Sequence, residues 1–282
     1  MRFNLKITTQ KIWLRVSGKE SRNLWNELTR TQSELTRTQS ELTRTQSELT
    51  RTQSELASRN DRHLRLHPYV AEALKAIAPP IEILRKNLRE SEAPNSVFTK
   101  YGSDKDERHS YGNVYKQILS KFLNPKILEI GVGSVNDFPY AGLQPGGALK
   151  AFKEIYPTSS IVGIDIDPQA IQTIEDDGFV GFIVDQTSEK SLEIVAKKLS
   201  QNGPFDLIID DGFHDPHANV KTLKVFFNLL SEDGTYVIED VHETLIDFWK
   251  VISPSLPGKL KILDMRDIRP GEPDNILILV TK

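Results

Sequence analysis

Apolar residues in the second half of the chain form short continuous runs that alternate with amphipathic stretches. Continuous runs of this length, bounded by turn residues, are typical of strands buried on both faces. The segments between them, such as GGALKAFKEIY and SEKSLEIVAKKLS, have helical spacing. This alternation predicts an α/β domain with a buried, mostly parallel sheet and helices on both faces. The expected strands cover residues 126–132, 160–166, 181–185, 205–210, 234–240, 260–265 and 274–282.

A tandem repeat dominates the first part of the chain. The heptad ELTRTQS occurs four times over residues 27–54, with Leu28 and its successors recurring every seven residues. Neither Gly nor Pro occurs between Glu20 and Leu66, so one long helix is expected from Ser21 to about Arg65. The second core position of each heptad is threonine, which is polar, β-branched and a weak helix former. Two alternatives stay open: a weak coiled coil that makes a homo-oligomer, or a solvated single helix.

The chain is therefore expected to have three parts. A basic segment and the heptad-repeat helix occupy residues 1–66, and a short helical pair or linker, broken at Pro79-Pro80, occupies residues 67–95. The strand–helix domain occupies residues 96–282.

Composition excludes several classes of protein. The chain has no cysteine, which rules out disulfides, thiolate metal sites and a cysteine nucleophile. Its apolar runs are far shorter than the ~20 residues of a membrane-spanning helix. Charges interrupt every apolar stretch of residues 1–20, which is unlike a signal peptide. A cytoplasmic protein is expected.

Charge is distributed unevenly. Residues 1–66 carry 13 Lys and Arg against 7 Asp and Glu, and the rest carries 23 against 32. The basic part is either a solvated helix face or a peripheral contact with a membrane surface. The acidic remainder argues against nucleic acid as a partner.

Acidic residues collect at the ends of the expected strands, where ligands of parallel sheets bind. The first strand runs into a turn with Gly131 and Gly133, which lets the backbone approach a ligand. Glu129 precedes this turn and would repel a pyrophosphate, so a cationic cofactor suits it better than NAD, the alternative. Asp165 ends the second strand, where a carboxylate can accept hydrogen bonds from both hydroxyl groups of a ribose. Asp185 and Gln186 end the third, where an adenine edge would lie.

These motifs give the chain a family resemblance. LEIGVG, GIDID and VDQT, in this order, resemble the class I S-adenosylmethionine-dependent methyltransferases over residues 96–282. The resemblance implies a Rossmann-like seven-stranded sheet whose last strand is antiparallel, and S-adenosylmethionine as cofactor.

Three further motifs narrow the resemblance. DDGFHD, VIEDVH and the stretch YGSDK with its following His and Tyr residues resemble the macrocin and mycinamicin type of sugar O-methyltransferase. Carried over position by position, Asp211, Glu239 and Asp240 match that family's Mg²⁺ ligands, and His214 matches its catalytic base. Oxygen ligands of this kind do select Mg²⁺ over softer metals. Ser103 is a candidate cofactor contact.

Other side chains in these motifs have two interpretations. His109, Tyr111 and Tyr115 either line the substrate cleft or pack, and Asp210 either buttresses its strand end or contacts the metal.

The sequence leads to one main hypothesis and two alternatives. The main one is a Mg²⁺-dependent transfer of methyl to a sugar hydroxyl, on a sugar-containing small molecule or a glycan precursor. Residues before 96 depart from the macrolide-tailoring enzymes, which favours an envelope glycan or its lipid-linked precursor over an antibiotic. The alternatives are a metal-independent small-molecule methyltransferase, and a coiled-coil scaffold carrying a degenerate methyltransferase domain.

Overall fold

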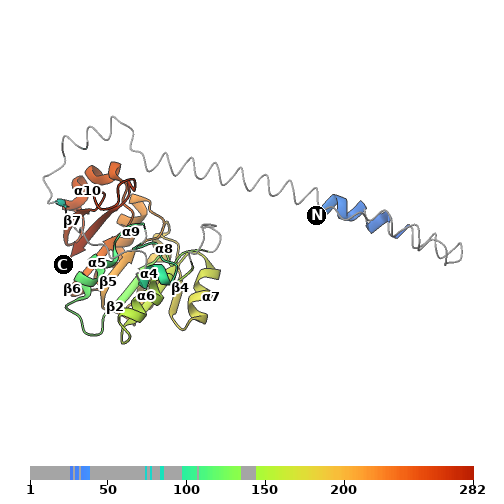
Figure 1. Ribbon diagram of the computed structural model, residues 1–282, viewed down its shortest axis with the longest axis horizontal. Coiled ribbons are helices and arrows are strands. Elements are labelled where there is room, and N and C mark those ends of the chain that lie inside the picture. The colour runs from blue at the N-terminus through green and yellow to red at the C-terminus, as the bar shows by residue number, and fades with distance from the viewer. Residues whose placement is uncertain are drawn as a thin grey trace. The chain divides into compact units, whose positions relative to one another are not determined.

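The computed structural model describes residues 26–27, 29–31, 33–38, 74, 77, 83–85, 97–106, 108–134 and 144–282. The chain divides into two units, residues 1–61 and 62–282. In Figure 1 the described residues of the first unit appear as the blue helical segment.

The described residues of the heptad repeat are helical. Two of the threonines expected at core positions donate their hydroxyl groups to backbone carbonyls one turn earlier: Thr31 to Glu27 at 3.0 Å and Thr38 to Glu34 at 2.9 Å. These hydroxyl groups thus find acceptors within their own helix. The rest of the expected helix, and any pairing through it, lie outside the described residues.

The second unit contains one mixed sheet, which has eight strands among the described residues, in the order β1-β7-β8-β6-β5-β2-β3-β4. All seven expected strands are present, and every pairing is parallel except those that β8 makes with β6 and β7. The strands are β1 (Ile83–Arg85), β2 (Lys126–Ile130), β3 (Ser160–Asp165), β4 (Val180–Ile183), β5 (Phe205–Asp210), β6 (Leu230–Ile238), β7 (Lys259–Asp264) and β8 (Ile276–Thr281).

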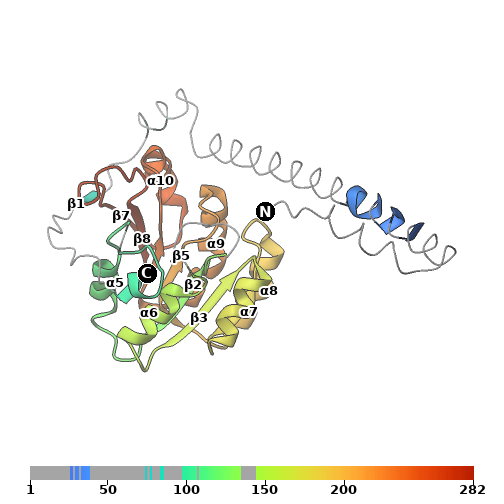
Figure 2. The same cartoon turned by 45° about the vertical axis from the view of Figure 1, so that its right-hand side comes forward.

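Helices cover both faces of this sheet (Figure 2). The helices are α4 (Val97–Lys100), α5 (Gly112–Leu119), α6 (Gly147–Ile155), α7 (Pro168–Asp176), α8 (Glu189–Leu199), α9 (Pro216–Phe226) and α10 (Ile246–Ile252), with short 3₁₀ turns η1 (Phe227–Leu229), η2 (Glu243–Leu245) and η3 (Ser253–Ser255). Helices α4 to α7 pack in one apolar cluster and α8 to α10 in the other. None of the helices in the described part of the chain is long and apolar enough to cross a membrane.

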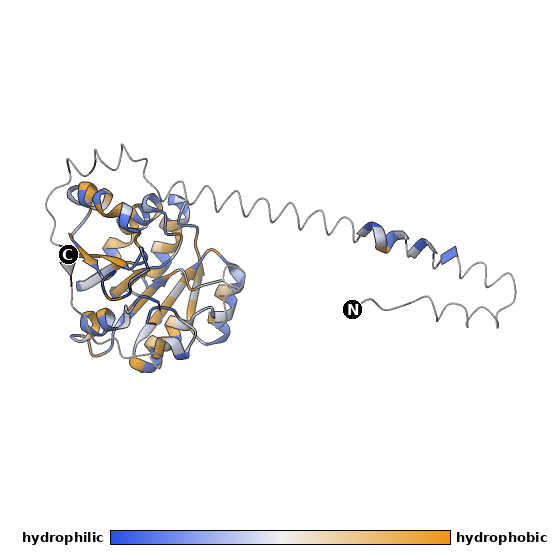
Figure 3. Ribbon diagram, turned by 45° about the horizontal axis from the view of Figure 1, so that its top comes forward, coloured by the Kyte–Doolittle hydropathy of each residue, from blue (hydrophilic) through white to orange (hydrophobic). Residues whose placement is uncertain are grey.

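Neighbouring strand residues point to opposite clusters. Ile127 and Leu207 belong to the first, whereas Leu128 and Ile208 belong to the second. Because both faces are covered, both sets of side chains must be apolar. Figure 3 shows the resulting mostly apolar strands between helices in which hydrophobic and hydrophilic residues alternate.

Strand β1 corrects one expectation. Residues 83–85 were expected in the second of two short helices, but they pair in parallel with β7, Ile83 opposite Ile262. The edge of β7 offers unpaired backbone groups, and pairing with them outweighs a helical spacing of apolar residues. Leu74 and Ile77 are helical, as expected, and Ile77 is exposed. The other residues of the expected helical pair lie outside the described ones.

The strand order sets the place of the site. In the sheet, β3 and β4 follow β2 on one side, and β5 and β6 follow it on the other. The crevice at the carboxyl ends of β2 and β5 is therefore the topological switch point, where ligands of such sheets bind.

Candidate active site

Backbone pairing at the switch point brings three acidic residues together. The amide of Asp211 donates to Ile130 O at 2.8 Å, and that of Glu239 donates to Asp210 O at 3.0 Å. The ends of β5 and β6 are thereby held in register beside β2, which carries Glu129. Gly131 makes this approach feasible: its φ is +83°, and a Cβ there would lie 2.1 Å from Asp211 O.

A buried lysine lies at the centre of these acids. Lys105 Nζ is 2.6 Å from Asp211 Oδ2, 2.8 Å from Glu239 Oε2 and 3.2 Å from Glu129 Oε1. Its side chain is only 2% exposed. Burial acts to lower the pKa of Lys105, but the charges of the three carboxylates outweigh it and raise that pKa well above its ordinary value. The ammonium therefore stays charged and offsets part of the acidic cluster.

Burial raises the pKa of both glutamates of the cluster. Burial raises the pKa of Glu129 to about 7, against the opposing effect of Lys105. Burial and the neighbouring Asp211 raise the pKa of Glu239 well above its ordinary value. Glu239 also accepts a hydrogen bond from the Tyr115 hydroxyl through Oε1, so each of its oxygens has a donor.

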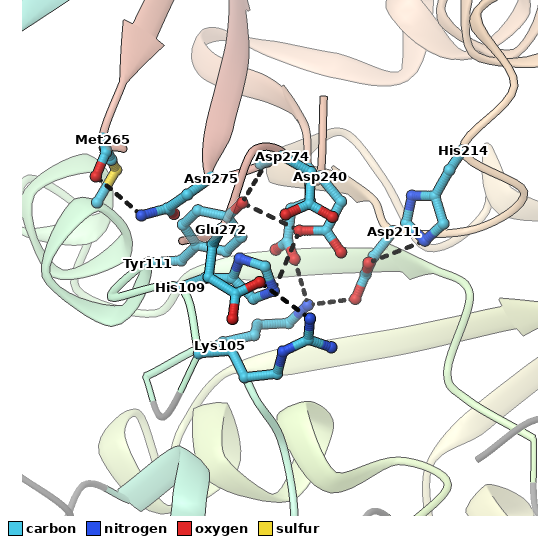
Figure 4. Close-up of polar contacts among 12 residues, drawn as sticks. Lys105, His109, Tyr111, Asp211, His214, Asp240, Met265, Glu272, Asp274 and Asn275 are labelled. Atoms are coloured by element: carbon cyan, nitrogen blue, oxygen red, sulfur yellow. Dashed lines mark hydrogen bonds and ion pairs between the residues drawn. The ribbon is translucent and has the colours of Figure 1, made fainter. Parts of the chain in front are cut away.

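Asp240 has donors of its own. The Tyr111 hydroxyl donates to Asp240 Oδ1 at 3.0 Å, and His109 Nε2 lies 3.6 Å from the same oxygen. The rings of His109 and Tyr111 are stacked, with centroids 4.9 Å apart. These side chains surround the acids in Figure 4.

His214 completes the arrangement on the more exposed side. Its Nε2 is 3.8 Å from Asp211 Oδ1, and its side chain is 36% exposed. One ligand atom each from Asp211, His214 and Asp240 lies within 4.8 Å of the others. Opposite ligands of Mg²⁺ are about 4.2 Å apart, since each bond is about 2.1 Å. A small closure of these side chains would thus let them surround a divalent cation.

The three candidate metal ligands and His214 differ in their chemistry and in the partners they already have. Asp211 and Asp240 offer carboxylate oxygens, which Mg²⁺ prefers, whereas an imidazole suits softer metals. Glu239 is 2% exposed and already has a donor on each oxygen, so its role as a ligand stays a prediction.

The expected cofactor residues lie along the adjacent strand ends. Asp165 ends β3 and accepts hydrogen bonds from the amides of Val132 at 2.8 Å and Asp167 at 2.9 Å. Burial raises its pKa, against these hydrogen bonds. Gly133 has φ +86°, and among the described residues the atom nearest to an added Cβ would be Pro145 Cα, at 4.0 Å. A cofactor contact of its backbone stays a prediction.

Gln186 connects the cofactor side to the loop that carries His214. Its Nε2 donates to Asp210 Oδ1 at 2.8 Å, and its Oε1 accepts from the amide of Phe213 at 2.8 Å. Asp210 is fully buried and also accepts from the Tyr236 hydroxyl at 3.0 Å, so it buttresses its strand end. An adenine contact of Gln186 stays a prediction.

Two other candidates have local partners. Asp185 accepts from the amide and hydroxyl groups of Thr187 at 2.8 and 2.6 Å. Ser103 is buried, and its hydroxyl lies 3.5 Å from the amide of Lys105. Cofactor contacts of both stay predictions. Asp215, in the same motif as His214, caps α9 by accepting from the amides of His217 and Ala218.

Lys105 is the residue that sequence reasoning missed. It stands in the motif YGSDK, in which the sequence indicated Ser103 and the His and Tyr residues that follow. A lysine is almost never fully buried unless it is paired. The available signal was an excess of acids at the strand ends, which requires a nearby cation.

Comparison with known proteins supports the family resemblance of the chain. No family model matches the chain. The chain resembles S-adenosylmethionine-dependent sugar O-methyltransferases, as its motifs predicted.

Two relatives illustrate the similarity. The chain is 32% identical over 150 residues to an 8-demethyl-8-α-L-rhamnosyl tetracenomycin-C 2′-O-methyltransferase of Streptomyces olivaceus, a match that covers 50% of this chain and 36% of the relative. It is 34% identical over 141 residues to a mycinamicin VI 2″-O-methyltransferase of Micromonospora griseorubida, covering 48% of this chain and 30% of the relative. The chain thus spans well under half the length of these relatives.

Among solved structures, MycE methyltransferase from the mycinamycin biosynthetic pathway, in complex with Mg and SAH, is 27% identical to the chain. The match has a TM-score of 0.44 and covers 57% of this chain and 41% of that one.

Proposed function

We propose that this protein is an S-adenosylmethionine-dependent, Mg²⁺-dependent O-methyltransferase that acts on a sugar hydroxyl. The observation that carries the proposal is the convergence of Asp211, Asp240 and His214 within 4.8 Å at the switch point. The relatives are named as enzymes that methylate sugar hydroxyls, which supports a sugar-containing acceptor.

Each residue has a defined role in this proposal. Asp211 and Asp240 hold Mg²⁺, with Glu239 as a further candidate ligand. A bound Mg²⁺ would orient the acceptor hydroxyl and lower its pKa. His214 accepts the hydroxyl proton at Nε2, because an imidazole within reach of the acceptor hydroxyl is the side chain most often used as a general base.

Cofactor binding falls to the neighbouring strand ends. Asp165 holds the ribose hydroxyls, and the backbone at Gly131 and Gly133 approaches the ligand. When bound, S-adenosylmethionine supplies the methyl group, and its sulfur keeps the electron pair of the broken bond. The chain's own contribution is therefore mainly to hold the reacting atoms in line.

One observation favours a second candidate, a methyltransferase that needs no metal. Lys105 already gives three of the carboxylates a positive partner, so part of the charge of the acidic cluster is offset without a metal ion. In this candidate, His214 removes the proton unaided.

Transfer of labelled methyl from S-adenosylmethionine to rhamnosylated and other deoxysugar-bearing acceptors would separate the two candidates. The reaction is run with Mg²⁺ and with excess EDTA. Incorporation of label only with Mg²⁺ supports the proposed function. Incorporation at the same rate in EDTA supports the metal-independent enzyme. No label on any sugar acceptor, with label on another hydroxyl compound, would overturn the substrate class.

A further inference from the structure

The side chains that hold the acidic cluster come from one short stretch of the chain. Lys105, His109, Tyr111 and Tyr115 together form what we call the donor cluster. Each of them directs a nitrogen or a hydroxyl group at Asp211, Glu239 or Asp240. All four side chains are almost completely buried, so none of them lies on an open cleft wall.

The donors are divided unevenly between the carboxylate oxygens. Lys105 donates to Asp211 Oδ2. Tyr111 donates to Asp240 Oδ1, and His109 Nε2 lies near the same oxygen. Within the described residues, no hydrogen bond reaches the other oxygen of either aspartate. Each aspartate is thus fixed by one oxygen and keeps the other for a ligand.

Three residues in and around this arrangement have an unusual backbone conformation. Ser110, His214 and Asp240 are the non-glycine residues of the described chain with positive φ, at +66°, +53° and +53°. Such conformations are uncommon outside glycine and persist only where the surroundings impose them. Ser110 separates His109 from Tyr111, whose rings stack and both approach Asp240.

An arginine holds this turn in place. Arg269 Nε donates to Ser110 Oγ at 2.9 Å, and a terminal nitrogen of Arg269 donates to Asp106 O at 2.8 Å. The turn is therefore tied to the segment that precedes β8. Packing of this kind fixes the orientation of groups around a metal-binding carboxylate.

We infer that the donor cluster is a positioning device, which orients one oxygen of Asp211 and one of Asp240 toward the cation beside His214. This inference rests on the proposed function, because it assumes that the aspartates bind a metal. It assigns His109 and Tyr111 to the positioning of Asp240 instead of to the substrate cleft. It also assigns Lys105 the role of a fixed cation that restrains Asp211.

Binding of Mn²⁺ alone, measured by electron paramagnetic resonance, tests this inference without substrate. Tyr111→Phe removes one hydroxyl group and keeps the ring that stacks on His109. Loss of such a supporting hydrogen bond typically weakens metal binding by about 10-fold or more. We expect that increase in the Mn²⁺ dissociation constant, together with an altered Mn²⁺ line shape, because Asp240 is no longer fixed. Affinity for S-adenosylhomocysteine should stay unchanged.

Tyr101→Phe is the matched control. It removes a tyrosine hydroxyl that donates to Glu154 at 2.6 Å, in an exposed contact outside the donor cluster. It should bind Mn²⁺ like the wild-type chain. His109→Leu is a second variant, for which a smaller loss of affinity is expected, since its contact with Asp240 is longer.

The outcomes separate this inference from the proposed function. Wild-type affinity and line shape in both Tyr111→Phe and His109→Leu would overturn the positioning role while leaving the metal site intact. Absence of Mn²⁺ binding by the wild-type chain would overturn the metal site and the positioning role together. A selective loss in the two variants, with Tyr101→Phe unaffected, is the result expected.

Discussion

Lys105 Nζ lies 2.6 Å from Asp211 Oδ2, although the two residues are 106 positions apart in the chain. The contact links the segment that precedes α5 and β2 to the end of β5. The protein's own lysine therefore offsets part of the negative charge of the carboxylates at the switch point.

Replacing Lys105 with Met should strongly destabilise the metal-free protein. Removing one partner of a buried ion pair leaves an uncompensated charge and typically costs about 3–5 kcal/mol. Urea unfolding in the presence of EDTA would measure the loss. Lys121→Met is the control, because Lys121 contacts the ring of Phe122 and is exposed. Equal stability of the two variants would contradict the conclusion that Lys105 offsets the charge of the buried carboxylates.

The turn at Gly131 should tolerate no side chain. Gly131→Ala places a Cβ 2.1 Å from Asp211 O, in addition to the cost of a positive φ. Gly178→Ala has a similar φ of +88° but no neighbour within 4 Å, so it isolates the conformational cost, about 1–2 kcal/mol. Thermal unfolding should show a markedly larger fall in Tm for Gly131→Ala. Similar falls would mean that the turn relaxes without disturbing Asp211.

His214 should be needed for turnover but not for cofactor binding. Loss of a general base typically slows a reaction by about 10²–10⁴-fold. His214→Ala should therefore lower kcat by that amount, with unchanged affinity for S-adenosylhomocysteine in calorimetry. His217→Ala, in which the lost ring packs edge-on against Phe248, should keep wild-type kcat. A fully active His214→Ala variant would exclude this residue as the base.

Asp165 should determine cofactor affinity. A hydrogen bond to a charged group contributes about 1.5–3 kcal/mol, so Asp165→Asn should weaken S-adenosylhomocysteine binding by about 10-fold or more. Isothermal titration calorimetry gives the dissociation constant directly. Asp177→Asn, which removes a carboxylate paired with Lys150 at 2.7 Å, should leave it unchanged. Wild-type affinity in Asp165→Asn would place the ribose elsewhere.

Glu129 should make the metal-free protein less stable as the pH rises. Its pKa is about 7 in the folded chain, above the ordinary value of 4.5, so the folded state holds the proton more tightly. The stabilisation is complete below pH ~4.5 and is lost as the pH rises through about 7, by up to ~1.4 kcal/mol per pH unit. Unfolding in EDTA should show this loss in wild type relative to Glu129→Gln. A constant difference between the two across this range would refute the raised pKa.

The sequence predicted those features that depend on local pattern. Continuous apolar runs predicted all seven main strands. The acids at the strand ends, together with the family resemblance, indicated Asp211, Asp240 and His214, which the fold brings close together. Strand β1 was missed because three residues carry too little local signal, and the edge of β7 decides their conformation. Lys105 was missed because its burial depends on acids that lie 106 and 134 positions further along the chain.

Strand β8 lies between β6 and β7, although it is the last strand in the chain. During synthesis, β7 and β1 can pair with each other, but β8 must insert before they join the rest of the sheet. The Tyr111 hydroxyl, which donates to Asp240, also lies 3.4 Å from the carbonyl oxygen of Asp274, just before β8. A nascent chain that has not yet reached β8 therefore lacks both a continuous sheet and the Asp274 carbonyl that lies beside the Tyr111 hydroxyl.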